Sequence, residues 1–203
     1  MRKTWWWVRH APVTCFGEKI YGQLDLPCNC DDIALFDRAV GQLPEEALWV
    51  TTPLARTAQT RDALLAAAAR RGLRRNIVEH RVEPRFAEQH LGTWQSCDRD
   101  EIDQQRGRPR HPYWLADPYE CPPHGESFLS LSARVGKGVD VLQQSHGPKD
   151  IVAVAHAGTI RAALMNALAL DASTALKVAI ANCAVVCIEL VDDGITRTGQ
   201  LKI

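Results

Sequence analysis

Two histidines and two arginines of the sequence each stand beside the end of a short apolar run. Arg9 and His10 follow the first run, Arg56 lies just beyond the second, and His156 follows the third. A neutral imidazole is a competent nucleophile toward phosphorus, and nearby arginines lower its pKa and stabilise charge on the oxygens of a transferring phosphoryl group. A leaving oxygen also needs a proton, so a carboxylic acid is expected at the same place. These residue types therefore favour phosphate chemistry.

Each of these side chains also has a purely structural explanation. A histidine at the end of a strand often caps the strand or lies on the surface, so neither His10 nor His156 is decisive alone. Arg56 is expected in the first turn of a helix, where the macrodipole disfavours a cation by a few tenths of a kcal/mol to about 1 kcal/mol. A bound anion would offset that penalty. The similar placement of all four groups favours an anion site over coincidence.

Three segments must bring these groups together, and they share one pattern. Each is predicted to be a strand that ends in a turn, and the second and third then continue as helices. The apolar runs 4–8, 47–51 and 150–155 predict buried strands. After the second run, Thr52 suits an N-cap and Pro53 the first helical position, and the alanine-rich stretch to Arg71 is followed by Gly72. After the third, residues 160–170 predict another helix.

Alternation of strands and helices indicates an α/β protein with three α/β/α layers around a central, mostly parallel sheet. In such sheets the carboxyl ends of the parallel strands lie on one edge, where helix N-termini present free N–H groups to anions. The four cationic groups are expected to converge on that edge. No linker or repeat marks a boundary, so residues 1–203 are expected to form a single domain.

The charge balance restricts the partner to something small. The 203 residues include 24 Lys and Arg against 24 Asp and Glu, a formal net charge of zero. A neutral chain has no overall field to hold nucleic acid or an anionic membrane, so neither is expected as a partner. The apolar run near the amino end is too short for a signal peptide or a membrane span, and we expect a cytoplasmic protein.

The seven cysteines do not indicate a disulfide framework, because their number is odd and no Cys-x-x-Cys occurs. Cys28 and Cys30 form the one tight pair, which is either a metal-binding pair or two reduced thiols. Cys183 and Cys187 flank an apolar stretch and are expected in the core. We expect no metal and no cofactor. The sequence also lacks the phosphate-binding loop, dinucleotide, zinc-protease and hydrolase-elbow motifs.

Five separated motifs resemble, in order and spacing, those of the histidine phosphatase superfamily, which has the phosphoglycerate mutase-like fold. They are Val-Arg-His-Ala-Pro at 8–12, Thr-Pro-Leu-Ala-Arg-Thr-Ala-Gln-Thr at 52–60, Glu-Gln-His-Leu-Gly-Thr-Trp at 88–94, His-Gly-Glu-Ser at 124–127 and Val-Ala-His-Ala-Gly-Thr-Ile-Arg at 154–161. The resemblance extends from residue 5 to about residue 190.

The resemblance implies a role for each matching position. His10 corresponds to the histidine that becomes phosphorylated, Arg9 and Arg56 to phosphate clamps, and His156 to the second histidine of the pocket. Glu88 corresponds to the proton donor that later activates water. From the residues alone, a solvated loop carboxylate would be the preferred interpretation of Glu88.

Several positions depart from the family pattern. Ala11 replaces the usual glycine after the nucleophile, so its φ is either negative or mildly strained. Gln95 and Ser96 replace a common Glu-Gly, and His124 replaces a glycine. His124 either lines the substrate side of the pocket or is an ordinary loop residue. None of these changes removes a catalytic group.

Within the superfamily, the segment Tyr-Gly-Gln-Leu-Asp-Leu-Pro at 21–27 is similar to the α-ribazole phosphatase branch of cobalamin biosynthesis. The resemblance places Gly22, Gln23 and Ala157 among the substrate contacts, with Gln23 either donating a hydrogen bond there or belonging to an ordinary turn. Residues 98–123 are the expected lid and specificity element. The aromatic side chains of this segment, Tyr113, Trp114 and Tyr119, either stack on a flat base or pack under the loop.

The sequence is compatible with three hypotheses about function. The first is a metal-independent phosphomonoesterase that works through a phosphohistidine at His10, with α-ribazole phosphate as the leading substrate. The second is a phosphoglycerate mutase-type isomerase, and the third is a non-catalytic module that binds a phosphorylated ligand. The intact set of five site residues argues against the third. All three take a small-molecule phosphate ester or a similar ligand, and a homodimer is left open.

Overall fold

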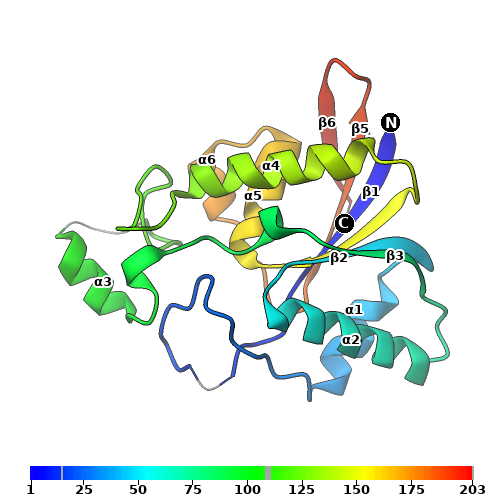
Figure 1. Ribbon diagram of the computed structural model, residues 1–203, viewed down its shortest axis with the longest axis horizontal. Coiled ribbons are helices and arrows are strands. Elements are labelled where there is room, and N and C mark those ends of the chain that lie inside the picture. The colour runs from blue at the N-terminus through cyan, green and yellow to red at the C-terminus, as the bar shows by residue number, and fades with distance from the viewer. Residues whose placement is uncertain (15, 108–110, 203) are drawn as a thin grey trace.

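A six-stranded sheet forms the centre of the computed structural model, which describes residues 1–14, 16–107 and 111–202 (Figure 1). The strands are β1 (Arg2–Arg9), β2 (Glu46–Thr51), β3 (Asn76–Val82), β4 (Asp150–Ala155), β5 (Val185–Asp192) and β6 (Arg197–Lys202). Their order across the sheet is β3-β2-β4-β1-β5-β6. The first four strands in that order run parallel to one another, whereas β5 is antiparallel to β1 and β6 is antiparallel to β5. The expected mostly parallel sheet is therefore confirmed.

Helices cover both faces of the sheet, which confirms the three-layer α/β/α class. The helices on one face are α4 (Phe128–Gln144), α5 (Ala157–Leu168) and α6 (Ala172–Leu176), and those on the other are α1 (Ile33–Gly41) and α2 (Ala55–Arg70) (Figure 1). The short helix α3 (Arg99–Arg106) and the 3₁₀ turns η1 (Pro84–Phe86) and η2 (Gly92–Trp94) belong to the connection between β3 and α4. A small cluster around Trp94 and Ile102 packs α3 against that connection.

The apolar run of β1 is buried on both of its faces, as expected for a central strand. Trp5 and Trp7 point to the α4–α5 side, where their rings stack with centroids 5.3 Å apart, while Val8 packs on the α1–α2 side. The indole N–H groups of Trp5 and Trp6 donate to Gln143 and Asp150. Each fully buried tryptophan contributes roughly 5 kcal/mol of apolar burial, before the entropy cost of ordering it. The strand that ends at His10 is thus firmly anchored.

The expected start of α2 is wrong by about two residues. The helix begins at Ala55, and its N-cap is Leu54, which has no side-chain capping bond. The hydroxyl of Thr52 contacts the Thr57 hydroxyl and the ring of His156 instead. The missing cap comes from a distant residue, since the Ala55 N–H donates to the carboxylate of Asp25 at 2.7 Å.

Helix α5 also differs from the expected 160–170. It begins at Ala157, directly after β4, and ends at Leu168 because Ala169 adopts a left-handed conformation with φ 52°. The early start matters because it places the free N–H groups of the first turn next to His156.

In the part of the chain that the structure describes, six cysteines are free. Cys183 is buried as expected, and burial raises the pKa of its thiol to about 12. Cys187 is only half-buried. The Sγ atoms of Cys28 and Cys30 lie 3.7 Å apart, and no three His, Cys, Asp or Glu side chains of the described residues are grouped in a way that could hold a metal ion. Cys15 lies outside the described residues. None of the helices in the described ranges is both long and apolar enough to cross a membrane.

Candidate active site

His10 lies directly after β1, at the carboxyl edge of the parallel strands, and is 1% exposed. Its Nδ1 is 2.6 Å from the carbonyl oxygen of Ala11, which can only accept. The proton of the neutral ring is therefore on Nδ1, and the lone pair is on Nε2. Burial, with smaller contributions from Arg56 and Arg9, lowers the pKa of His10 to about 3. At neutral pH the ring is an uncharged base with a nucleophilic Nε2.

The turn after His10 tolerates alanine, because Ala11 is not among the described non-glycine residues with positive φ. The Ala11 N–H donates to the hydroxyl of Thr60 at 2.9 Å, and Thr60 donates in turn to the Arg56 carbonyl. The carbonyl of His10 accepts from the amide of Asn182. The backbone on both sides of the imidazole is thus held by side chains of other elements.

Arg56 comes from the first turn of α2 and is fully buried. Its two terminal nitrogens each donate to a backbone carbonyl at 2.7 Å, those of Leu24 and Gly22. The guanidinium also lies 5.1 Å from the ring centroid of Tyr21. Burial lowers the pKa of Arg56, while Glu88 acts in the opposite direction. Since guanidinium groups stay protonated in proteins, a positive charge is fixed deep in the site.

His156 lies at the end of β4, and its ring centroid is 5.2 Å from that of His10. Its Nε2 contacts the hydroxyl of Thr52 at 3.0 Å. The side chain is fully buried, and burial together with the charge of Arg56 holds the pKa of His156 well below its ordinary value. The two rings are therefore both neutral and adjacent.

Three buried nitrogens of this cluster have no hydrogen-bond partner among the described residues. They are Nε of Arg9, Nε of Arg56 and Nδ1 of His156. A terminal nitrogen of Arg9 donates to the carbonyl of Ile180 at 2.6 Å. Buried polar groups are nearly always paired in folded proteins, and exceptions concentrate where a ligand binds. Nitrogens grouped around an uncharged imidazole suit an anion with several oxygens.

Glu88 is 8% exposed, so the interpretation as a solvated loop carboxylate is wrong. One carboxylate oxygen accepts from the Gln89 N–H at 3.0 Å, and the other accepts from the Gly158 N–H of α5 at 3.2 Å. The approach to α5 requires glycine, because a Cβ at position 158 would lie 2.3 Å from a carboxylate oxygen. The spacing of Glu88 in the sequence could not reveal this contact, which depends on the path of the loop.

A pocket of about 250 Å³ opens beside this cluster. Its wall includes Arg9, Gly22, Glu88 and Ala157 from the expected site, whereas His10, Arg56 and His156 are not part of the wall. Gln23 is not part of it either: its amide donates to the Glu88 carbonyl at 2.7 Å. Gln23 therefore supports the loop that carries Glu88, and no donation from it into the pocket is found.

Of the three aromatic residues expected over the pocket, only Trp114 lines it. Tyr113 and Tyr119 are 63% and 72% exposed and are not part of the pocket wall. Trp114 is held between Arg161, 4.6 Å from its ring centroid, and the side chain of Gln89, which accepts from its indole N–H. His124 is exposed and absent from the pocket wall. Residues 108–110 of this expected lid lie outside the described residues.

Two supporting hydroxyls, those of Thr52 and Thr60, are not predicted from the sequence. A signal existed for Thr60, which is four residues after Arg56 and therefore on the same face of α2. Thr52 has the residue type of a helix cap, and nothing local indicates that its hydroxyl reaches a histidine 104 positions away.

Comparison with known proteins identifies the family. The profile of the histidine phosphatase superfamily (branch 1) matches residues 5–199, and the chain belongs to this superfamily. A search of curated proteins finds no match.

Several solved structures share the fold. A candidate alpha-ribazole-5'-P phosphatase from Escherichia coli has a TM-score of 0.79 at 17% identity, with 99% of this chain and 95% of that chain covered. The mycobacterial glucosyl-3-phosphoglycerate phosphatase has a TM-score of 0.76 at 24% identity, covering 100% and 98%. Bacillus stearothermophilus YhfR has a TM-score of 0.77 at 20% identity, covering 99% and 96%. The architecture is thus the phosphoglycerate mutase-like α/β fold.

Proposed function

We propose that the chain is a phosphomonoester hydrolase that works through a phosphohistidine at His10. The observation that carries the proposal is the uncharged His10 imidazole, its Nε2 available, beside three unpartnered buried nitrogens of Arg9, Arg56 and His156. A phosphoryl group presents three oxygens to such a set. Family membership supports the same reaction class.

The proposed reaction has two steps. In the first, Nε2 of His10 forms a bond to phosphorus while the bond from phosphorus to the ester oxygen breaks, and Glu88 as a carboxylic acid protonates that oxygen. In the second, the Glu88 carboxylate takes a proton from water, the water oxygen bonds to phosphorus, and the phosphorus–nitrogen bond breaks. Inorganic phosphate leaves, and His10 and Glu88 return to their starting states. Arg9, Arg56 and His156 stabilise the charge on the phosphoryl oxygens in both steps.

For the substrate we propose a small phosphate ester, with α-ribazole phosphate as the leading candidate. The segment 21–27 supports this choice, and so does the name of the E. coli structure. Residues 98–123 are proposed as the specificity element, because Trp114 forms part of the pocket wall. The glucosyl-3-phosphoglycerate phosphatase makes a sugar phosphoglycerate the second ester to test.

The mechanism is tested by phosphate release from 4-nitrophenyl phosphate. His10→Ala should leave no measurable turnover, while the wild type should yield an acid-labile phosphoenzyme on rapid quenching. With an alkyl ester such as glycerol 3-phosphate, whose leaving group depends on protonation, Glu88→Gln should slow turnover roughly 10²–10⁴-fold while sparing inhibition by inorganic phosphate. The exposed His146 offers a matched control, since His146→Ala should retain full activity. Activity in His10→Ala would refute the mechanism, and loss of activity with chelators would refute its independence from metal.

A second assay separates hydrolysis from isomerisation. The protein is incubated with 3-phosphoglycerate and a bisphosphoglycerate primer, and the products are resolved by NMR. Free phosphate supports the proposed hydrolase, whereas 2-phosphoglycerate would identify a mutase. Binding of phosphate without either product would identify a non-catalytic module. A phosphate-release screen over α-ribazole phosphate, glucosyl-3-phosphoglycerate and sugar phosphates then ranks the substrates.

A further inference from the structure

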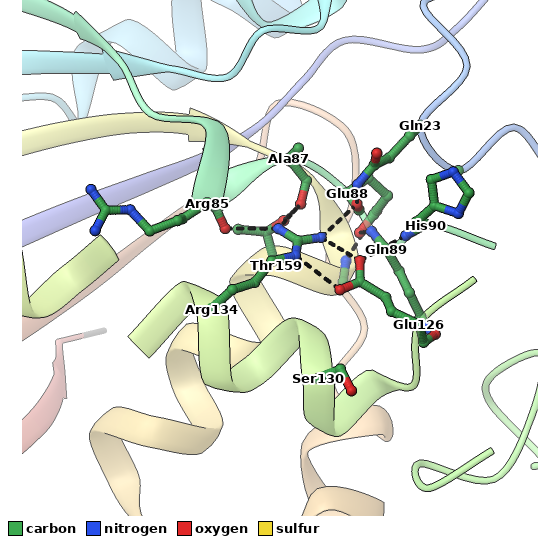
Figure 2. Close-up of polar contacts among 12 residues, drawn as sticks. Gln23, Arg85, Ala87, Glu88, Gln89, His90, Glu126, Ser130, Arg134 and Thr159 are labelled. Carbon is green, nitrogen blue, oxygen red and sulfur yellow. Dashed lines mark hydrogen bonds and ion pairs between the residues drawn. The ribbon is translucent and has the colours of Figure 1, made fainter. Parts of the chain in front are cut away.

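Arg134 lies on α4, outside the pocket wall, yet its guanidinium is bonded to the loop that carries Glu88 (Figure 2). One terminal nitrogen donates to the carbonyls of Arg85 and Ala87, both at 2.7 Å. The other donates to the carbonyl of Glu88 at 2.8 Å and to a carboxylate oxygen of Glu126 at 2.6 Å. Nε donates to the second Glu126 oxygen at 3.0 Å. The guanidinium plane thus satisfies three carbonyls of one short loop segment.

Glu126 extends the same support to His90, two residues beyond Glu88. The Glu126 oxygen that accepts from the terminal nitrogen of Arg134 also accepts from the His90 N–H at 2.8 Å. The Glu126 backbone bonds to His90 and to the amide of Gln89. Arg134 and Glu126 therefore contact the backbone on both sides of Glu88, as Figure 2 shows.

This support is needed because the loop has little regular structure of its own. It runs from the end of η1, which contributes the Arg85 and Phe86 carbonyls, to η2, and it has no strand pairing. Apart from Arg134 and Glu126, its carbonyls are held by the Thr159 hydroxyl and the Gln23 amide. Apart from the Glu126 N–H, which donates to the His90 carbonyl, each of these donors is a side chain from a different part of the chain. The position of Glu88 is therefore set from outside the loop.

The contacts of the Glu88 carboxylate also tolerate little displacement of this side chain. Its two oxygens accept from the N–H groups of Gln89 and Gly158, and the second contact brings the carboxylate against the α5 backbone. A loop that moved away from α4 would break the contact with Gly158. A shift of about 1 Å in a reacting group costs on the order of 10²-fold in rate.

We infer that Arg134, paired with Glu126, is a positioning residue for the proton transfer by Glu88. The inference rests on the proposed function, since it assigns Arg134 an effect that acts only through the Glu88 carboxylate. The pair is well suited to this task, because a planar guanidinium fixes direction as well as distance and a charge-assisted bond is stronger than a neutral one. A lysine has no such fork.

The test compares two classes of ester. An alkyl phosphate such as glycerol 3-phosphate releases a poor leaving group that depends on protonation, whereas 4-nitrophenyl phosphate releases a good one that needs little help. Arg134→Met should lower kcat for the alkyl ester about 10- to 100-fold, lower kcat for the aryl ester far less, and leave KM within about threefold. Arg134→Lys, which keeps the charge and the fold, should give an intermediate ratio.

Arg85 offers a matched control. It also forms a two-bond pair with a glutamate, Glu83, but its side chain points away from the Glu88 loop (Figure 2). Arg85→Met leaves the Arg85 carbonyl that Arg134 uses, so the ratio of alkyl to aryl rates should stay at the wild-type value. Thermal melting of each variant establishes that the compared proteins are folded.

A double-mutant cycle decides between positioning and general disruption. In a Glu88→Gln background the ratio should already be low, and adding Arg134→Met or Arg134→Lys should not lower it further. A ratio unchanged in the Arg134 variants would overturn the inference, as would an undiminished effect in the Glu88→Gln background. If Glu88→Gln itself left both rates unchanged, the proposed role of Glu88 would fail instead.

Discussion

Gly158→Ala is the substitution whose effect the structure defines most sharply. The added Cβ would lie 2.3 Å from an oxygen of Glu88, and an ordinary contact begins near 3.4 Å, so the carboxylate must retreat by about 1 Å. A displacement of that size in a reacting group costs on the order of 10²-fold in rate. Because Gly158 lies within α5, alanine also improves the helix propensity by up to about 1 kcal/mol.

The two effects have opposite signs, which makes the result distinctive. We expect kcat for an alkyl phosphate to fall about 100-fold, while the melting temperature changes by no more than about 4 °C. Inhibition by inorganic phosphate should change little, because the substitution displaces the acid and leaves Arg9 and Arg56 in place. Steady-state kinetics with glycerol 3-phosphate and a thermal melt measure all three quantities.

Gly136→Ala provides the matched control. Gly136 lies inside α4, and a Cβ there would meet only the amide of Asn166 at 3.2 Å. The Gly136→Ala variant should therefore have the wild-type kcat and an equal or higher melting temperature. If Gly158→Ala retained wild-type kcat on the alkyl ester, the contact between Glu88 and α5 would have no catalytic importance, and the reasoning would be refuted.

Substitutions at three further positions test the nucleophile and its surroundings. The pKa of His10 is lowered from 6.5 to about 3 in the folded protein. As the pH falls from 6.5 to 3, only the unfolded chain takes up a proton at this imidazole, so the stability of the folded protein should decline over this range. Urea midpoints at pH 7 and pH 5 should therefore differ less for His10→Gln than for the wild type. Arg56→Lys should weaken inhibition by inorganic phosphate and lower stability by about 1–3 kcal/mol, measured by urea unfolding. Arg56 reaches the Leu24 and Gly22 carbonyls with two separate nitrogens of a planar guanidinium, and the single ammonium of lysine does not reproduce that geometry. An unchanged urea midpoint would contradict this. Thr60→Val should destabilise by a similar amount, since the N–H that follows His10 loses its acceptor, whereas Thr60→Ser should restore most of the loss.

Much of the fold followed from local sequence patterns. The strand predicted at 150–155 matches β4. The α/β/α class, which was predicted from three apolar runs each followed by turn residues, is also confirmed. Helix starts were less predictable. Thr52 has the residue type of a cap, but its hydroxyl bonds to His156, and the cap comes from Asp25, 30 positions before Ala55. Such exchanges depend on tertiary contacts that no local pattern contains.

The candidate site likewise contains residues that local sequence patterns predict and residues that depend on tertiary contacts. His10, Arg56 and His156 could be placed together because each follows the end of a parallel strand, and strand ends share an edge. Glu88 could be placed only by resemblance, since its loop has no regular structure and is held by side chains from other elements. Arg134 gave no signal, because an arginine on an amphipathic helix normally faces water.

The position of β1 in the sheet has a consequence for biosynthesis. The strand is made first, but its neighbours are β4 and β5, which begin at residues 150 and 185. At about 5–20 residues per second, the ribosome needs roughly 7–30 s after β1 before β4 is made. During that time Trp5, Trp6 and Trp7 have no sheet to join. Nascent chains should therefore depend on holding chaperones, and fragments that stop before β5 should aggregate rather than fold.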